Sequence, residues 1–164
     1  MQINPDRDVV LDRVLNAPPS LVWRCWTEPD LFCQWYGPKP GSIVAARMDL
    51  RPGGQFWFTM AGPDGQSFPN EGCFLEVVPE QKLVFTDLMT ADYAPVPEVN
   101  PEFGPAFTVV LTFAPEGNGT RYRAIARHRS AAEAKLNNDM GFAENWSKVA
   151  EKLDEFLAKV GDCR

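Results

Sequence analysis

The chain has 164 residues, of which 45% are hydrophobic and 23% are charged, a balance typical of a globular protein. Its 16 basic and 22 acidic residues give a net charge of −6, which argues against general nucleic-acid binding and against docking on anionic lipid. No apolar run approaches the roughly 18 residues needed to span a bilayer. The first residues also lack the pattern of a signal peptide. We therefore expect one cytoplasmic domain over residues 1–164.

The residues that most often hold metals are few and badly spaced for that purpose. The cysteines are Cys25, Cys33, Cys73 and Cys163, none of which forms a C-x-x-C pair, and His128 is the only histidine. The ligand spacings of a zinc site are absent. In a chain of this length without an export signal, reduced thiols are the simpler expectation. The sequence predicts neither a metal site nor a cofactor.

The first fifth of the chain reads as one strand followed by two short helices. Residues 8–16 alternate between apolar and polar side chains, which predicts a strand. Pro18 and Pro19 then permit a helix to begin, and Pro29 separates this helix from a second one that ends at Gly37. Both helices are too short to be stable alone, so their aromatic residues must pack on a larger element.

Most of the middle of the chain reads as strand. Glycine-rich and proline-rich turns separate six predicted strands, which cover residues 42–50, 55–61, 70–78, 82–89, 107–115 and 120–129. The last two are predicted to form a hairpin across Gly117-Asn118-Gly119. The segment from Thr90 to Pro105 is rich in proline and reads as a long loop, the kind that often forms a lid over a binding site.

The last predicted element is a long amphipathic helix. Ser130 and Glu133 form a capping box at its start, and the pattern extends to about Val160, a length of about 45 Å. Gly141 lies inside the pattern at a cost of about 1 kcal/mol against alanine, which indicates close packing or a bend. One apolar stripe is formed by Leu136, Met140, Ala143, Trp146, Ala150, Leu153 and Leu157.

Together these elements predict an α+β fold. An antiparallel sheet with helices on one face is the arrangement that this order of elements favours. We expect a curved antiparallel sheet wrapped around the long C-terminal helix, with the two short helices closing one end.

Several segments resemble the START-like (SRPBCC, helix-grip, Bet v-like) superfamily, and most closely its branch named after the activator of a heat-shock chaperone's ATPase. They fall in that family's order and spacing: NAPPSLVWRCWTEPDLFCQWYGP, DLRPGGQFWF, GPDGQSFPNEGCFLEVVPEQKLVFTD, GTRYRAIARH and MGFAENW. The resemblance covers nearly the whole chain. It implies the helix-grip fold, with a hydrophobic cavity between curved sheet and long helix.

The resemblance does not imply one activity. Members of the superfamily include lipid and hormone binders, aromatase/cyclases and chaperone co-factors, and many bacterial relatives of this branch are uncharacterised. In the most similar subgroup, histidines tend to lie before and just after the Met-Gly-Phe motif. Here those positions are Asn137 and Ala143, so acid–base chemistry that relies on such histidines is not implied.

The many aromatic side chains are too numerous to be exposed together. Their simplest role is to form a core, but a subset can also line a cavity for an apolar or aromatic ligand. The predicted cavity residues, the last two of them as polar tips, are Trp57, Phe85, Met140, Trp146, Tyr122 and His128.

Three kinds of polar group could have either a functional role or an ordinary structural one. His128 shares a strand face with Tyr122 and is either a polar anchor for a ligand or, as we favour, a histidine satisfied by a backbone carbonyl. The arginines on the opposite face are expected to be solvated and paired with nearby acids. Asp87 and Glu71 could point inward with a raised pKa, but we favour an outward position for both.

Three functions are compatible with this sequence. The first is binding of a small apolar or aromatic molecule in the cavity, and the second is a cyclase or hydrolase reaction on a hydrophobic or polyketide-like substrate. The third, which is the weakest, is stimulation of a heat-shock chaperone's ATPase. The sequence has no strong catalytic motif. Neither nucleic acid nor a membrane is an expected partner, and the chain is expected to be a monomer or a homodimer.

Overall fold

The computed structural model describes residues 1–37, 41–96 and 105–162. Seven strands form one antiparallel sheet in the order β1-β9-β8-β5-β4-β3-β2. These strands are β1 (Asp8–Leu15), β2 (Ile43–Met48), β3 (Gln55–Ala61), β4 (Ser67–Val78), β5 (Lys82–Thr86), β8 (Thr108–Glu116) and β9 (Gly119–Arg127). The helices are α1 (Pro19–Thr27), α2 (Pro29–Trp35), α3 (Ala131–Asp139) and α4 (Phe142–Asp162). The predicted α+β class is confirmed.

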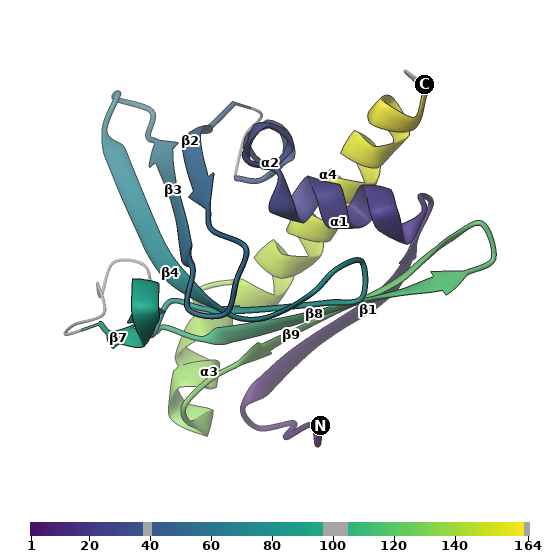
Figure 1. Cartoon of the computed structure of the whole chain (residues 1–164). Helices are drawn as coiled ribbons and strands as arrows, with labels where there is room; N and C mark the ends of the chain where they lie inside the picture. The colour runs from purple at the N-terminus through teal and green to yellow at the C-terminus, as the bar shows by residue number, and fades with distance from the viewer. Residues whose placement is uncertain (38–40, 97–104, 163–164) are drawn as a thin grey trace.

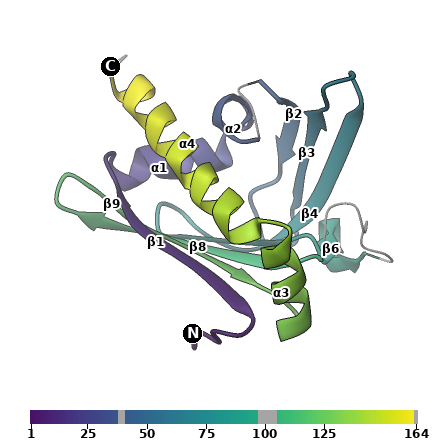
Figure 2. The same ribbon diagram turned by 180° about the vertical axis from the view of Figure 1, so that it is seen from behind.

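The sheet is strongly curved, and α4 crosses its concave side (Figure 1). Seen from behind, the same helix runs diagonally across the strands, with α3 below it (Figure 2). Helix α4 packs against α1, α2 and β1, while the β2–β3–β4 half of the sheet rises on the other side (Figure 1). This is the predicted helix-grip arrangement, with the two short helices at one end.

The tryptophans near the start of the chain belong to the core. Trp26 of α1 packs edge-on against Trp35 of α2, with ring centroids 5.0 Å apart. Phe32 of α2 reaches the sheet, 5.6 Å from the ring of Phe56. The Trp35 indole N–H donates to the carbonyl of Cys25 at 2.8 Å, which joins the two helices. The aromatic residues of α1 and α2 therefore fasten these short helices to the sheet.

The predicted long C-terminal helix is present as α4, but it does not run unbroken from Ser130, because two helices meet at Gly141. Ser130 does cap α3, because its hydroxyl accepts from the Glu133 amide at 3.2 Å. Gly141 then has a φ of +85°, a left-handed conformation that interrupts the helical hydrogen-bonding pattern. The interruption turns the two helices relative to one another, so Leu136 and Met140 of the predicted stripe are 52% and 50% exposed. Trp146, at the start of α4, is buried.

The faces of β3 alternate strictly, although three aromatic residues follow one another. Phe56 and Phe58 pack into the core on the concave face. Trp57 lies on the convex face, where the Arg47 guanidinium stacks over its ring at 4.2 Å. Its neighbour across the β3–β4 pair is Glu71, which is exposed. Trp57 therefore does not face the interior, contrary to the expectation from the sequence.

The convex face also carries the arginine row of β9. Arg121 pairs with Asp12 and Glu116, with nitrogen–oxygen distances of 3.1 Å and 2.7 Å. Arg127 pairs with the buried Asp8 at 3.1 Å. These pairs match the interpretation of a solvated face balanced by local acids.

Part of the predicted lid segment, Thr90 to Pro105, is ordered against the sheet. Strands β6 (Met89–Thr90) and β7 (Ala94–Pro95) pair across the short helix η1 (Ala91–Tyr93). Asp92 accepts from Arg51 at 3.5 Å, and its amide donates to the Gly53 carbonyl. Residues 97–104 of the predicted lid lie outside the described part of the chain. Among the described helices, none is long and apolar enough to cross a membrane.

Candidate functional site

Aromatic side chains on the concave face are only partly covered. Phe85 lies on the central strand β5 and packs 5.9 Å from the ring of Trp26 and 4.9 Å from that of Phe56. A central position normally buries such a residue completely, yet Phe85 is only half-buried. Phe58 and Tyr36, whose rings lie 5.5 Å apart, are also half-buried. The concave face under α2 is therefore incompletely filled by the described side chains.

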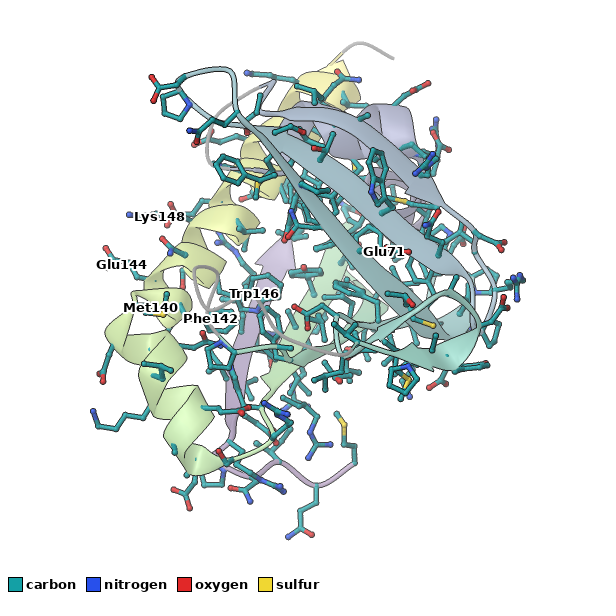
Figure 3. The ribbon with its side chains drawn as sticks, turned by 90° about the vertical axis from the view of Figure 1, so that its left-hand side faces the viewer. Glu71, Met140, Phe142, Glu144, Trp146 and Lys148 are labelled. Carbon is teal, nitrogen blue, oxygen red and sulfur yellow. The ribbon has the colours of Figure 1, made fainter. Side chains whose placement is uncertain are left out.

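Helix α4 contributes the opposite wall. Phe142 and Trp146 stack one turn apart, with ring centroids at 5.8 Å and an angle of 17° between the planes. Both point from α4 toward the sheet, whereas Glu144 and Lys148 point away from it (Figure 3). Phe107, just before β8, meets the edge of Phe142 at 4.8 Å. Aromatic surface from the sheet and from α4 thus faces the same interior.

Two tyrosine hydroxyls stand in this interior. Burial raises the pKa of Tyr36 to about 12, and the negative charge of Asp87 adds to the increase. Burial also raises the pKa of Tyr122 well above its usual range, although the Trp26 side chain partly opposes the change. Both phenols therefore stay protonated near neutral pH and are able to donate hydrogen bonds.

The Asp87 carboxylate lies just beyond β5, where its Oδ1 accepts from the Phe107 amide at 2.8 Å. Burial raises the pKa of Asp87, while hydrogen bonds from the backbone amides of Phe107 and of Asp87 itself act against the rise. The side chain nevertheless keeps water-accessible surface. Both properties hold together when protein crowds a carboxylate on most sides and leaves one side open. Asp87 is exposed, which matches the outward position that the sequence favoured, although the protein around it raises its pKa.

His128 is fully engaged by protein atoms. Its Nδ1 lies 3.0 Å from the carbonyl oxygen of Arg7, to which Nδ1–H donates. Its Nε2 lies 2.8 Å from Nδ2 of Asn137, which donates to it. The same amide nitrogen of Asn137 reaches the Pro105 carbonyl at 3.3 Å. Both ring nitrogens have partners, so this geometry matches the histidine held by a backbone carbonyl rather than a free anchor.

Two buried indole groups lack partners. Trp26 is 1% exposed and Trp146 is 7% exposed, and the Nε1 atom of each has no hydrogen-bond partner. The Trp26 side chain lies close enough to the Tyr122 hydroxyl to lower the pKa of Tyr122 slightly against the effect of burial. The two groups nevertheless do not meet the geometry of a hydrogen bond. An unsatisfied buried donor costs about 1–3 kcal/mol, so two of them in one interior need an explanation.

The structure sorts the predicted cavity residues into two groups. Phe85, Tyr122, His128 and Trp146 belong to the concave face or to the wall formed by α4. Trp57 and Met140 do not, because one lies on the convex face and the other on the exposed side of the helix break.

Sequence reasoning missed three interior residues of interest. Trp26 and Phe107 were counted among the aromatic residues that cannot all be exposed, but neither was assigned to the cavity, and Tyr36 was not singled out. The spacing of Trp26 from Val22 and Cys25 does indicate a buried face. The identity of the surface that covers this face follows only from the tertiary structure.

Two surface hollows occur elsewhere on the described part of the molecule. One lies beside the β4–β5 turn and Phe113, and the other lies between the N-terminal segment and Arg127. Neither is between the sheet and α4. An enclosed cavity at that place therefore stays a prediction.

Metal and disulfide chemistry have little support in the described ranges. Within these ranges no group of histidine, cysteine and acidic side chains could hold a metal ion. Cys25, Cys33 and Cys73 carry free thiols, and burial raises the pKa of Cys25 to about 12. A thiol of this kind is a poor nucleophile near neutral pH.

The sequence from residue 16 to residue 158 matches the profile of the family described as Activator of Hsp90 ATPase homolog 1-like protein. The chain belongs to this family. The match spans the two short helices, six of the seven strands of the main sheet and most of α4. The predicted family resemblance is confirmed.

Solved structures of several bacterial proteins share the fold of this chain. A protein from Nitrosomonas europaea is 41% identical, with a TM-score of 0.87 over 98% of this chain and 99% of that one. A protein from Mycobacterium smegmatis is 26% identical, with a TM-score of 0.69 over 93% and 91% of the two chains. A protein from Arthrobacter aurescens, at 23% identity and a TM-score of 0.76 over 97% and 90%, shows the fold alone. The curated proteins contain no match to the sequence.

Proposed function

We propose that this member of the Hsp90-activator-like family binds a small, largely apolar molecule between the concave face of the sheet and α4. The observation that carries the proposal is the incomplete burial of Phe85. It lies on the central strand, faces the core cluster and still keeps accessible surface. An aromatic ligand that covers this surface gains roughly 25 cal/mol per Å² of apolar area removed from water.

The surroundings of Phe85 have the chemistry of a small-molecule site. Aromatic rings dominate the interior, and a few polar groups stand among them, as is typical of ligand pockets. Phe58 and Tyr36 supply one side, and Phe107, Phe142 and Trp146 supply the other. The protonated phenols and indoles can orient a ligand without the cost of burying a charge.

A fluorescence titration with N-phenyl-1-naphthylamine, a neutral apolar dye, tests this proposal. We expect saturable binding with an increase in dye emission, because the dye leaves water for an apolar site. Phe85→Leu should weaken binding several-fold through lost ring contact, while the matched variant Trp57→Leu on the convex face should bind like the parent. Absence of saturable binding, or equal losses in both variants, would contradict the proposal. Far-UV circular dichroism of each variant checks that it is folded.

A catalytic role is a second candidate because Asp87 borders the same interior. A carboxyl group with a raised pKa, crowded by protein but open on one side, can act as an acid or a base. If a bound compound is turned over, Asp87→Asn should abolish turnover and leave dye binding intact. Stimulation of a chaperone ATPase stays a prediction from the family resemblance, since the described residues supply no further argument for it.

A further inference from the structure

We propose that the preferred ligand of this interior carries a carbonyl oxygen, which accepts a hydrogen bond from the unpartnered indole N–H of Trp26 or Trp146. This inference rests on the proposed function and specifies the class of ligand. A hydrocarbon of the same shape would fill the space and leave both donors unsatisfied.

The first step of the argument concerns the donors. Trp26 and Trp146 are both more than nine-tenths buried, and Nε1 of each has no partner in the described structure. Trp35 offers an internal comparison, because its Nε1 donates to the Cys25 carbonyl at 2.8 Å. The fold thus provides a backbone acceptor for the buried indole N–H of Trp35, which joins two helices. It provides none for the indoles of Trp26 and Trp146.

The second step concerns where the two donors lie. The Trp26 ring lies 5.9 Å from that of Phe85, and the Trp146 ring lies 6.4 Å from that of Phe107. Phe85 and Phe107 lie on or next to the paired strands β5 and β8, and both pack against the same core cluster. Each donor therefore lies beside one of two phenylalanines that border the same interior. An aromatic ligand over Phe85 and Phe107 would bring its substituents near one indole or the other.

The third step concerns the balance of donors and acceptors. Burial keeps Tyr36 and Tyr122 protonated, so their hydroxyls add to the donors of this interior. A phenol oxygen can also accept, but in the described structure no oxygen accepts from the indole N–H of Trp26 or of Trp146, so both indoles lack an acceptor. A ketone or ester oxygen supplies it without introducing a charge, which a buried site admits only at high cost.

Two ligands of matched shape test the inference: benzophenone, which has a carbonyl group, and diphenylmethane, which has a methylene group in its place. Competition against N-phenyl-1-naphthylamine measures the affinity of each. We expect benzophenone to bind at least about tenfold more tightly, the equivalent of about 1.4 kcal/mol. The advantage should disappear in Trp26→Phe or in Trp146→Phe, while the affinity for diphenylmethane changes little. Trp57→Phe, on the convex face, is the control and should keep the full advantage.

The outcomes separate this inference from the proposed function. Equal affinities for the two compounds would overturn the carbonyl inference and leave the binding proposal standing, with ordered water as the partner of the indoles. An advantage that survives in both interior variants would also overturn it. If the dye binds but neither compound displaces it, only the carbonyl inference falls, whereas if the dye itself does not bind, both proposals fall.

Discussion

The side-chain amide of Asn137 donates to Nε2 of His128 at 2.8 Å, and this bond joins α3 to the end of β9. On its other side, Nδ1 of the ring is held by the carbonyl of Arg7. The histidine is therefore a structural link among three segments that are far apart in the sequence. Its role in the fold explains why it is buried without needing a ligand.

Removal of the amide should destabilise the protein. In Asn137→Ala, Nε2 of His128 becomes an unsatisfied buried acceptor, at an expected cost of about 1–3 kcal/mol in the free energy of unfolding. Urea denaturation measures this cost. Asn138→Ala is the matched control, because Asn138 is exposed on the same helix and should change stability by less than about 0.5 kcal/mol. Equal stability of the two variants would show that the bond to His128 contributes nothing.

The raised pKa of Asp87 predicts an unusual dependence of stability on pH. The folded state holds the carboxyl proton more tightly than the unfolded chain does, whose carboxyl group has an ordinary pKa of 3.8. The free energy of unfolding therefore falls as the pH rises from 3.8 through the higher pKa of the folded state. Asp87→Asn removes the ionisation and keeps an oxygen that can accept from the Phe107 amide. The variant should be more stable than the parent at pH 7, and the difference should close as the solution is acidified below that window.

Urea midpoints across this pH range measure the effect of Asp87. The control is Asp64→Asn, in the exposed turn after β3, which should follow the parent at every pH. A variant at position 87 that is less stable than the parent at neutral pH would show that the folded state favours the charged carboxylate, which contradicts a raised pKa for Asp87.

The substitution Gly141→Ala, which adds a single methyl group, tests the left-handed backbone conformation at the helix break through its effect on stability. A Cβ at this position has room, since its nearest neighbour would be Asn145 Nδ2 at 3.9 Å, so the cost of Gly141→Ala comes from the left-handed backbone alone. We expect a loss of about 1 kcal/mol. Gly161→Ala, inside α4 and in open space, should be neutral or slightly stabilising by up to about 1 kcal/mol. A stabilised Gly141→Ala protein would indicate one continuous helix.

The sheet and the early helices could be predicted from the sequence because their signals are local. Apolar alternation and turn residues marked each strand of the main sheet, and Pro29 marked the boundary between α1 and α2. The long helix was the exception. Its apolar periodicity continues through Gly141, and periodicity alone does not show whether a glycine bends a helix or ends it.

The interior residues were harder to predict because both faces of some strands are apolar. Phe56, Trp57 and Phe58 are consecutive, so the pattern of β3 does not decide which of them points inward. Met140 was misplaced for a different reason, since its position in the stripe assumed an unbroken helix. The missing partners of Trp26 and Trp146 depend on tertiary contacts, which no local pattern contains.

The central claim is that an apolar molecule binds between the concave face and α4, and the indole resonances test it most directly. In a ¹H–¹⁵N spectrum of the chain, the five tryptophans give separate indole signals that single substitutions can assign. Addition of N-phenyl-1-naphthylamine should shift the signals of Trp26 and Trp146 in a saturable manner and leave that of Trp57 in place. A spectrum in which only Trp57 responds, or in which no indole signal moves at the highest soluble dye concentration, would contradict the account.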